Sequence, residues 1–162
     1  MLFRSIGLIA GPHGFGSAQV RRSGFERALA EAGIKLPRSL IADGQYTFES
    51  GISGAQSLFD LSPRPTAIFA CNDEMAAGVL YAARVRGIAV PEDLSIIGFD
   101  DTPIAARVWP PLTTVRWPIV SMGRSAALKL IGDTIDGHDP VEEPSTFLST
   151  LIRRGSVAPP SA

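Results

Sequence analysis

A cluster of polar side chains directly follows an apolar stretch of this sequence. The stretch FACNDEMAAG, residues 69–78, passes from apolar residues into Asn72, Asp73 and Glu74. An amide both donates and accepts hydrogen bonds and carboxylates accept them, so this set suits a ligand that carries hydroxyl groups. A structural role would explain the same residues, because Asn72 can cap a following helix and two acidic residues favour its N-terminus.

A second cluster makes the binding interpretation stronger. The stretch SIIGFDD, residues 95–101, also ends an apolar run in polar residues, here Asp100 and Asp101. Ligands of open parallel sheets bind beyond the carboxyl ends of the strands, where loops and helix N-termini meet. If both apolar runs are neighbouring strands, Asn72 and Asp100 lie on one polar rim.

Other kinds of site have weaker support in the sequence. The stretch GPHGFGS, residues 11–17, has the glycines of a phosphate loop, but Ser17 stands where that motif requires Lys. His13 and His138 are far apart and have no second histidine or cysteine at ligand spacing, so no metal site is expected. Carboxylates could hold magnesium or act as acid and base, but no nucleophile motif accompanies them. We expect no catalysis and no cofactor.

Composition narrows the class of protein further. The 162 residues are 45% hydrophobic and 19% charged, typical of a globular α/β protein, and Lys plus Arg number 15 against 16 Asp plus Glu. Such a balance offers no positive excess for nucleic acid. One cysteine, Cys71, cannot form an internal disulfide, and no apolar run reaches the roughly 18 to 20 residues of a membrane helix. The expected location is the cytoplasm, away from membranes.

Strand and helix patterns alternate along the chain, which predicts a doubly wound, mainly parallel α/β sheet. Ser17 is expected to cap the first helix, and Gly33 and Gly87 to end the first and third. Short apolar runs predict strands at residues 6–10, 36–42, 66–71 and 94–99, and helical spacing predicts helices at 17–32, 47–59 and 73–86.

These motifs resemble those of one protein family. The resemblance is carried by the combination of NDEMAAG, VPEDLSIIGFDD and PPLTTV, with IGLIAGP and RRSGFERALAEAGI upstream and LIRRGS downstream. The chain is similar to the lactose-repressor and galactose-repressor (LacI/GalR) family of bacterial transcription regulators. The resemblance covers nearly the whole chain. It implies one lobe of a sensor domain similar to periplasmic binding proteins, a cleft for a sugar or similar small effector, and a homodimer that binds operator DNA through an N-terminal helix-turn-helix.

The resemblance also assigns roles to single positions. Asp73 is interpreted as a cap and helix-dipole residue, and Asp101 as a structural carboxylate. The dimer interface is expected to include Ala77, Tyr81, Val108 and Trp109. The expected effector-binding residues are Ser17, Arg21, Tyr46, Asn72, Asp100 and Trp117, of which Trp117 could instead pack at a hinge.

By the same resemblance the chain has four parts. Residues 1–117 form the C-terminal lobe, 118–140 a crossover helix that packs on an N-terminal lobe, 141–155 a final returning strand, and 156–162 a tail. No helix-turn-helix is found in the sequence, so operator binding would need a headpiece that this chain lacks. Two alternatives stay open: a solute-binding protein of a sugar transporter, and a truncated fragment without independent activity.

Overall fold

The computed structural model describes residues 5–132 and 146–159. Its centre is a four-stranded sheet in the order β2-β1-β3-β4, in which every pairing is parallel. The strands are β1 (Ile6–Ala10), β2 (Ile41–Asp43), β3 (Ala67–Ala70) and β4 (Ser95–Ile97). This architecture confirms the predicted doubly wound, mainly parallel α/β fold.

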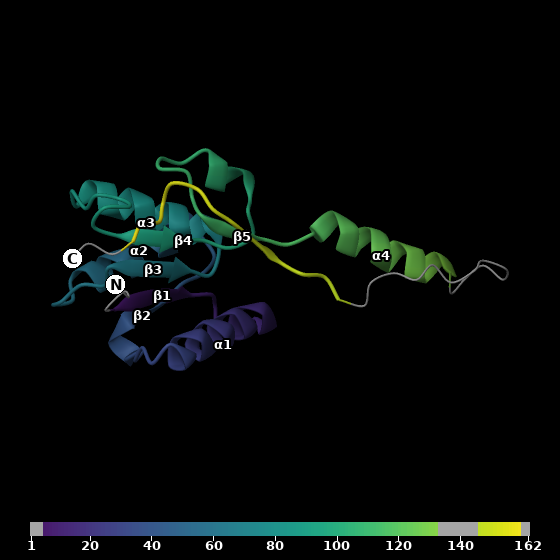
Figure 1. The fold of residues 1–162 in the computed structure, drawn as a ribbon, viewed down its shortest axis with the longest axis horizontal. Coiled ribbons are helices and arrows are strands. Elements are labelled where there is room, and N and C mark those ends of the chain that lie inside the picture. Colours follow the sequence, from purple (N-terminus) through teal and green to yellow (C-terminus); the bar gives the residue numbers. More distant parts are fainter. Residues whose placement is uncertain (1–4, 133–145, 160–162) are drawn as a thin grey trace.

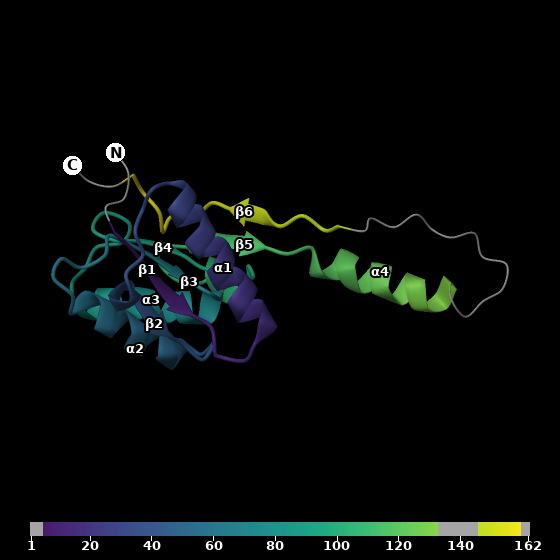
Figure 2. The same ribbon diagram turned by 90° about the horizontal axis from the view of Figure 1, so that it is seen from below.

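Helices cover both faces of the sheet. Figure 2 shows α1 (Gly16–Glu31) on one face, and α2 (Phe48–Phe59) with α3 (Asp73–Val85) on the other. The ring of Phe25 from α1 stacks on Phe69 of β3, with 5.4 Å between centroids. Because both faces are covered, the central strands consist of apolar residues without alternation, as parallel strands usually do.

Local sequence signals define most helix ends. The Thr47 side chain accepts a hydrogen bond from the Ser50 N–H and so caps α2. Gly33 and Gly87 follow α1 and α3 with φ of 69° and 68°, a conformation that glycine adopts without strain. The expected cap at Ser17 is wrong, because α1 already begins at Gly16 and has no side-chain cap.

Three glycines allow α2 and α3 to approach each other and the sheet closely. A side chain at Gly51 would collide with the backbone of Met75 in α3, and one at Gly78 with the carbonyl oxygen of Phe48 in α2. A side chain at Gly54 would press on Ile9 of β1, 3.1 Å away. Glycine is unfavourable in the interior of a helix, but the packing of α2 requires Gly51 and Gly54.

The sheet continues into a second, smaller element. Strand β5 (Thr114–Arg116) pairs antiparallel with β6 (Thr150–Ile152), and two isolated parallel bridges connect residues 113 and 116 to Ile97 and Asp100. Beyond β5, α4 (Ile119–Gly132) extends away from the sheet, as Figure 1 shows. Within the described residues, no helix is long and apolar enough to span a bilayer.

Some predicted boundaries need correction. The stretch expected as a strand at 36–42 starts with a short 3-10 helix, η1 (Arg38–Leu40), and only then enters β2. A second such helix, η2 (Pro103–Ala106), follows β4. The crossover helix was expected at residues 118–140, and the part of that range after residue 132, including His138, lies outside the described residues.

Candidate functional site

The candidate site lies at the carboxyl ends of three adjacent strands. Since β1, β3 and β4 are parallel neighbours, the residues that follow them, Gly11, Asn72 and Asp100, come to the same edge of the sheet. The sequence predicted this juxtaposition from two apolar runs that end in polar residues. Open parallel sheets bind their ligands at this edge.

Arg21 is the central side chain of this edge. It projects from α1, and its Nη2 donates to Oδ1 of Asp100 at 2.7 Å. Its Nη1 donates to the carbonyl oxygen of Cys71, at the end of β3, at 2.5 Å. The side chains of Arg21 and Asp100 keep 14% and 28% of their surface exposed, so a ligand in the cleft can still reach the pair.

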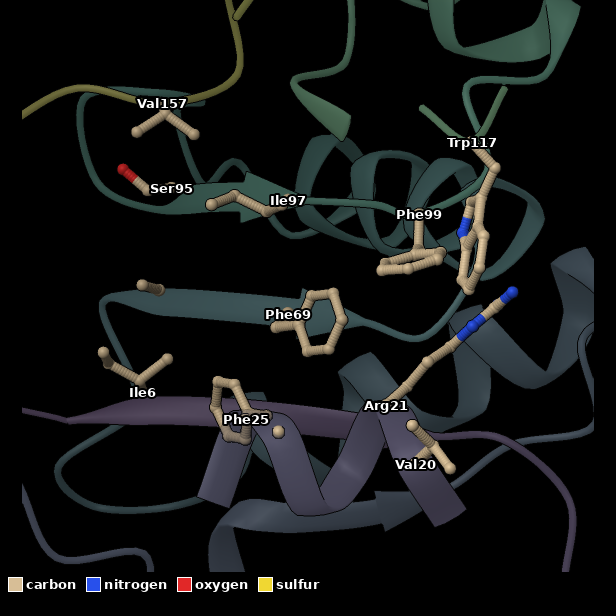
Figure 3. Close-up of a pocket in the computed structure, with 12 residues that line it drawn as sticks. Ile6, Val20, Arg21, Phe25, Phe69, Ser95, Ile97, Phe99, Trp117 and Val157 are labelled. Atoms are coloured by element: carbon tan, nitrogen blue, oxygen red, sulfur yellow. The ribbon is translucent and has the colours of Figure 1, made fainter. Parts of the chain in front are cut away.

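Aromatic rings surround the guanidinium group. The Cζ atom of Arg21 lies 4.1 Å from the ring centroid of Phe99 and 5.8 Å from that of Tyr46. Trp117 packs edge-on against Phe99 with 5.6 Å between centroids, and Figure 3 shows Trp117, Phe99 and Arg21 grouped together. Phe99 was missed among the predicted site residues. Its place two residues after Ile97, the last residue of β4, was a usable signal, because strand residues two apart share a face, and Ile97 and Phe99 line the same groove.

Three polar atoms in the site have no hydrogen-bond partner within the described part of the chain. They are the Nε of Arg21, the hydroxyl of Tyr46 and the Nε1 of Trp117, and all three are buried. An unsatisfied buried polar group costs about 1–3 kcal/mol. The site therefore has hydrogen-bonding capacity that the protein itself does not use.

Backbone strain is concentrated in the same place. Among the described non-glycine residues only Tyr46, Asp100 and Asp101 have positive φ, at 62°, 104° and 52°. Such conformations are costly and gather at binding sites. Gly11 makes room for Tyr46, because a Cβ there would lie 2.5 Å from the Tyr46 ring.

The two adjacent carboxylates differ in their electrostatics. Burial raises the pKa of Asp100 above its usual value, although the charge and hydrogen bond of Arg21 act in the opposite direction. Burial would also raise the pKa of Asp101, but hydrogen bonds and charges from Arg154 and Arg116 bring it below its usual value. Asp101 accepts from Arg116 at 2.5 Å and from Arg154 at 2.7 Å. It is the structural carboxylate that the sequence predicted.

Asn72 has the capping role that was considered beside ligand binding. Its Oδ1 accepts from the Met75 N–H at 2.9 Å, and its Nδ2 donates to the Tyr46 carbonyl oxygen at 3.0 Å. One amide hydrogen is left for a ligand. Asn72 thus caps α3 and at the same time fixes the strained backbone of Tyr46.

The interpretation of Asp73 as a helix-dipole residue is incomplete. Asp73 is fully buried, and its carboxylate accepts hydrogen bonds from Thr102 and Thr114. Although Asp73 does lie in the first turn of α3, its side chain points into the protein. No local pattern indicates these partners, because they lie 29 and 41 residues away.

The other predicted residues lie apart from this cluster. Ser17 is exposed in the first turn of α1, and no group of three metal-ligating side chains occurs among the described residues. His13 is exposed and lies 3.5 Å from Asp43. Of the predicted interface residues, Tyr81 and Trp109 are 52% and 83% exposed and Val108 is half-buried, whereas Ala77, at 2% exposed, offers almost no surface.

A groove of about 590 Å³ runs from the site along the sheet face beside α1. Arg21, Phe99 and Trp117 line the end at the site, and Ile6 and Val157 lie at the far end (Figure 3). Away from the site its walls are almost entirely apolar. At the far end the Ser95 hydroxyl is bonded to the backbone of Ala158, so the unused polar groups that could recognise hydroxyls lie at the end with Arg21.

Comparisons with known proteins agree with this geometry. Residues 3–157 match the family described as "Periplasmic binding protein-like domain". The HTH-type transcriptional regulator GalS of Salmonella typhimurium is 43% identical over 94% of this chain and 45% of its own length. The chain thus spans about half the length of the curated relatives that it matches.

Solved structures show the same fold. A sugar-binding transcriptional regulator of the LacI family from Escherichia coli, complexed with phosphate, superposes with a TM-score of 0.90 at 38% identity, over 97% of this chain and 56% of that one. The complex of the regulator CelR with cellobiose gives a TM-score of 0.83 at 35% identity, over 95% of this chain and 47% of that one. The chain belongs to the periplasmic-binding-protein-like family and, within it, to the LacI/GalR-type regulators.

Proposed function

We propose that this chain is a ligand-sensing lobe that binds a sugar or a similar hydroxylated effector at the carboxyl edge of its sheet. In a longer regulator, this binding would control the affinity for operator DNA. The observation that carries the proposal is the Arg21–Asp100 pair, which is half-accessible, framed by aromatic rings, and held next to unused polar atoms. Its relatives include a sugar-binding regulator and a regulator complexed with cellobiose.

The chemistry of the site fits a sugar. A carboxylate accepts hydrogen bonds from two neighbouring hydroxyls, and a guanidinium donates to their oxygens. Asp100 has acceptor capacity left beside its bond to Arg21, and Arg21 has an unused Nε. Tyr46, Phe99 and Trp117 offer ring surface for the apolar side of a sugar ring.

The same edge offers little for catalysis. The described residues contain no metal-ligand cluster, and the acidic side chains of the site are taken up by Arg21, Arg116 and Arg154. The relatives are transcription regulators, which favours a sensor over an enzyme and over the solute-binding protein of a transporter. A regulator of this kind acts where the DNA is, so we place it in the cytoplasm.

Operator binding is proposed only for a longer protein. This chain has a net charge of −1 and no excess of Lys and Arg. Affinity for DNA depends on neutralising phosphates with such residues. We therefore propose that the chain alone does not bind an operator.

A homodimer through the exposed side of α3 is a further part of the proposal. Tyr81 packs its ring 5.8 Å from that of Phe48, and Trp109 lies beside Leu80 and Arg84 in a groove of about 320 Å³. Large exposed aromatic side chains are enriched at protein interfaces. Trp109, Val108 and Tyr81 would form its centre, with Ala77 left out because it is buried.

The described part of α4 supports the expectation that residues 118–140 pack on a second lobe. Ile119 and Val120 in its first turn are 65% and 86% exposed, and α4 points away from the sheet (Figure 1). Contiguous exposed apolar residues mark interaction sites. In this proposal residues 1–117 form the sensing lobe and 141–155 return to it.

Ligand-observed NMR with a panel of sugars and nucleosides tests the sensor proposal. Asp100→Asn keeps the shape of the side chain but removes its charge, and we expect at least one panel member to bind the parent chain and to bind this variant more weakly. Asp60→Asn is the matched control, since Asp60 is an exposed carboxylate paired with Arg86 on the surface. Equal binding by both variants would contradict the proposed site.

A further inference from the structure

Asp73 is the most completely buried charged side chain near the site, and its hydrogen bonds connect three separate elements. It lies in the first turn of α3, with none of its surface exposed. Oδ2 accepts from the Thr102 N–H at 2.7 Å and from the Thr102 hydroxyl at 3.2 Å. Oδ1 accepts from the Thr114 hydroxyl of β5 at 2.5 Å.

These partners adjoin or contact the strained turn that carries Asp100. Thr102 directly follows Asp100 and Asp101, whose φ values of 104° and 52° are unfavourable for residues with side chains. The hydroxyl of Thr114 also accepts a hydrogen bond from the Asp101 N–H at 3.4 Å. A strained turn persists only where its surroundings hold it in several places.

The surrounding packing leaves room for this carboxylate and little else. A side chain at Gly98 would collide with Oδ1 of Asp73 and come within 2.8 Å of Leu112. Burial raises the pKa of Asp73, while the hydrogen bonds from Thr114 and Thr102 oppose that rise. Such hydrogen bonds are those that a buried carboxylate needs in order to remain charged.

We infer that Asp73 is a positioning residue, which holds the Asp100–Asp101 turn in its left-handed conformation and fastens it to β5, so that Asp100 meets Arg21 and the effector in a fixed orientation. Asp73 itself does not touch the effector. The role in effector binding rests on the proposed function, whereas the role in holding the turn does not.

A simpler role for Asp73 would be to stabilise α3 through its charge. Glu74 provides the comparison, because it also lies in the first turn of α3 but is exposed. If charge at the helix N-terminus is what matters, Glu74→Ala and Asp73→Ala should act alike. If the turn is what matters, only Asp73→Ala should change the conformation of residues 100 and 101.

The decisive experiment measures the turn without a ligand. Three-bond couplings between the amide and α protons report φ, and we expect those of Asp100 and Asp101 to change in Asp73→Ala and to remain at parent values in Glu74→Ala. Thr114→Val serves if Asp73→Ala does not fold, because it removes the hydrogen bond to Asp73, together with the longer one from the Asp101 N–H, and retains the charge at α3. Thr114→Ser restores the hydroxyl and should restore the couplings. The inference is overturned if the couplings of Asp100 and Asp101 stay at parent values in Asp73→Ala. If Asp73→Ala does not fold, the same outcome in Thr114→Val overturns it.

The second arm measures affinity for the panel sugar that binds the parent chain best. A turn that can relax must be brought back to its strained conformation when the sugar binds, so binding should weaken about tenfold or more in Asp73→Ala. Glu74→Ala and Ser156→Ala are controls. The Ser156 hydroxyl links Ile96 of β4 to the N–H of Thr113, just before β5, so its removal breaks two buried hydrogen bonds outside the turn. Changed couplings with no sugar bound by any variant would count against the proposed function alone. Changed couplings with parent-like affinity would overturn the positioning role.

Discussion

Replacing Arg21 by methionine should destabilise the protein, and by more at neutral pH than in mild acid. Arg21→Met keeps an apolar stem in the groove but removes the hydrogen bonds to Asp100 and to the Cys71 carbonyl. It also removes the contact of the guanidinium with the Phe99 ring at 4.1 Å. Asp100 is then left as a half-buried carboxylate without a counter-charge.

The magnitude follows from these contacts. A hydrogen bond between charged groups contributes about 1.5–3 kcal/mol, and a cation–π contact about 0.5–1 kcal/mol at a partly exposed position. Since both side chains keep some contact with water, and methionine regains part of the apolar contact, we expect a net loss of about 2 kcal/mol in the free energy of unfolding at pH 7.5.

The pH dependence has a definite sign. Burial raises the pKa of Asp100 in the folded state, so its contribution to stability is complete below the unfolded pKa and is lost as the pH rises through the folded pKa. Removing Arg21 raises that pKa further, which makes the ionised carboxylate more costly at neutral pH. In mild acid a larger share of Asp100 is neutral in the variant, so the loss of stability should be smaller there.

Urea denaturation of both proteins at pH 7.5 and pH 4 measures this difference. Arg22→Met is the matched control, because Arg22 is the next residue of α1 and pairs with Glu26 on the helix surface at 2.7 Å. It should cost no more than about 0.5 kcal/mol at either pH. A loss for Arg21→Met that is the same at both pH values would refute the electrostatic reasoning.

Three further predictions concern other parts of the fold. Arg154 and Arg116 bring the pKa of Asp101 below its usual value in spite of its burial, so Asp101 stabilises the fold above the unfolded pKa, and this stabilisation is lost as the pH falls. Asp101→Asn should therefore flatten the dependence of stability on pH below about pH 4, and an unchanged dependence would contradict this role of Asp101. Gly78→Ala should lower the free energy of unfolding by about 1–3 kcal/mol, because it forces α2 and α3 apart, whereas the side chain of Gly16→Ala meets open space and should not destabilise the protein. Calorimetric unfolding compares the two variants, and equal stability would exclude the close contact at Gly78. Trp109→Asp should abolish self-association in sedimentation, and a variant that associates as well as its parent would place the interface elsewhere.

The sequence predicted most of the sheet and one edge of the site. Apolar runs that end in Asn72 and Asp100 were enough to bring these residues together, because neighbouring parallel strands end at the same edge. The role of Arg21 came only through the family resemblance. No local pattern shows that a side chain in α1 reaches a residue 79 positions further along.

What the sequence could not show is mainly long-range packing. Gly51 is unfavourable for a helix by local propensity, and the close contact with α3 that requires it is not local. Asp73 looked like an ordinary acidic residue at a helix start, because its partners come from β5 and from the loop after β4. Such residues are recognised only when the elements are assembled.

Amide-resolved NMR titration of the chain with the best-binding panel sugar tests the central claim most directly, because it locates even a weak site. We expect saturable shifts at Arg21, Tyr46 and Asp100 and at the indole N–H of Trp117, with the indole of Trp109 unchanged. Saturable shifts that gather away from the carboxyl edge of the sheet, or no binding by any sugar or nucleoside of the panel, would contradict it.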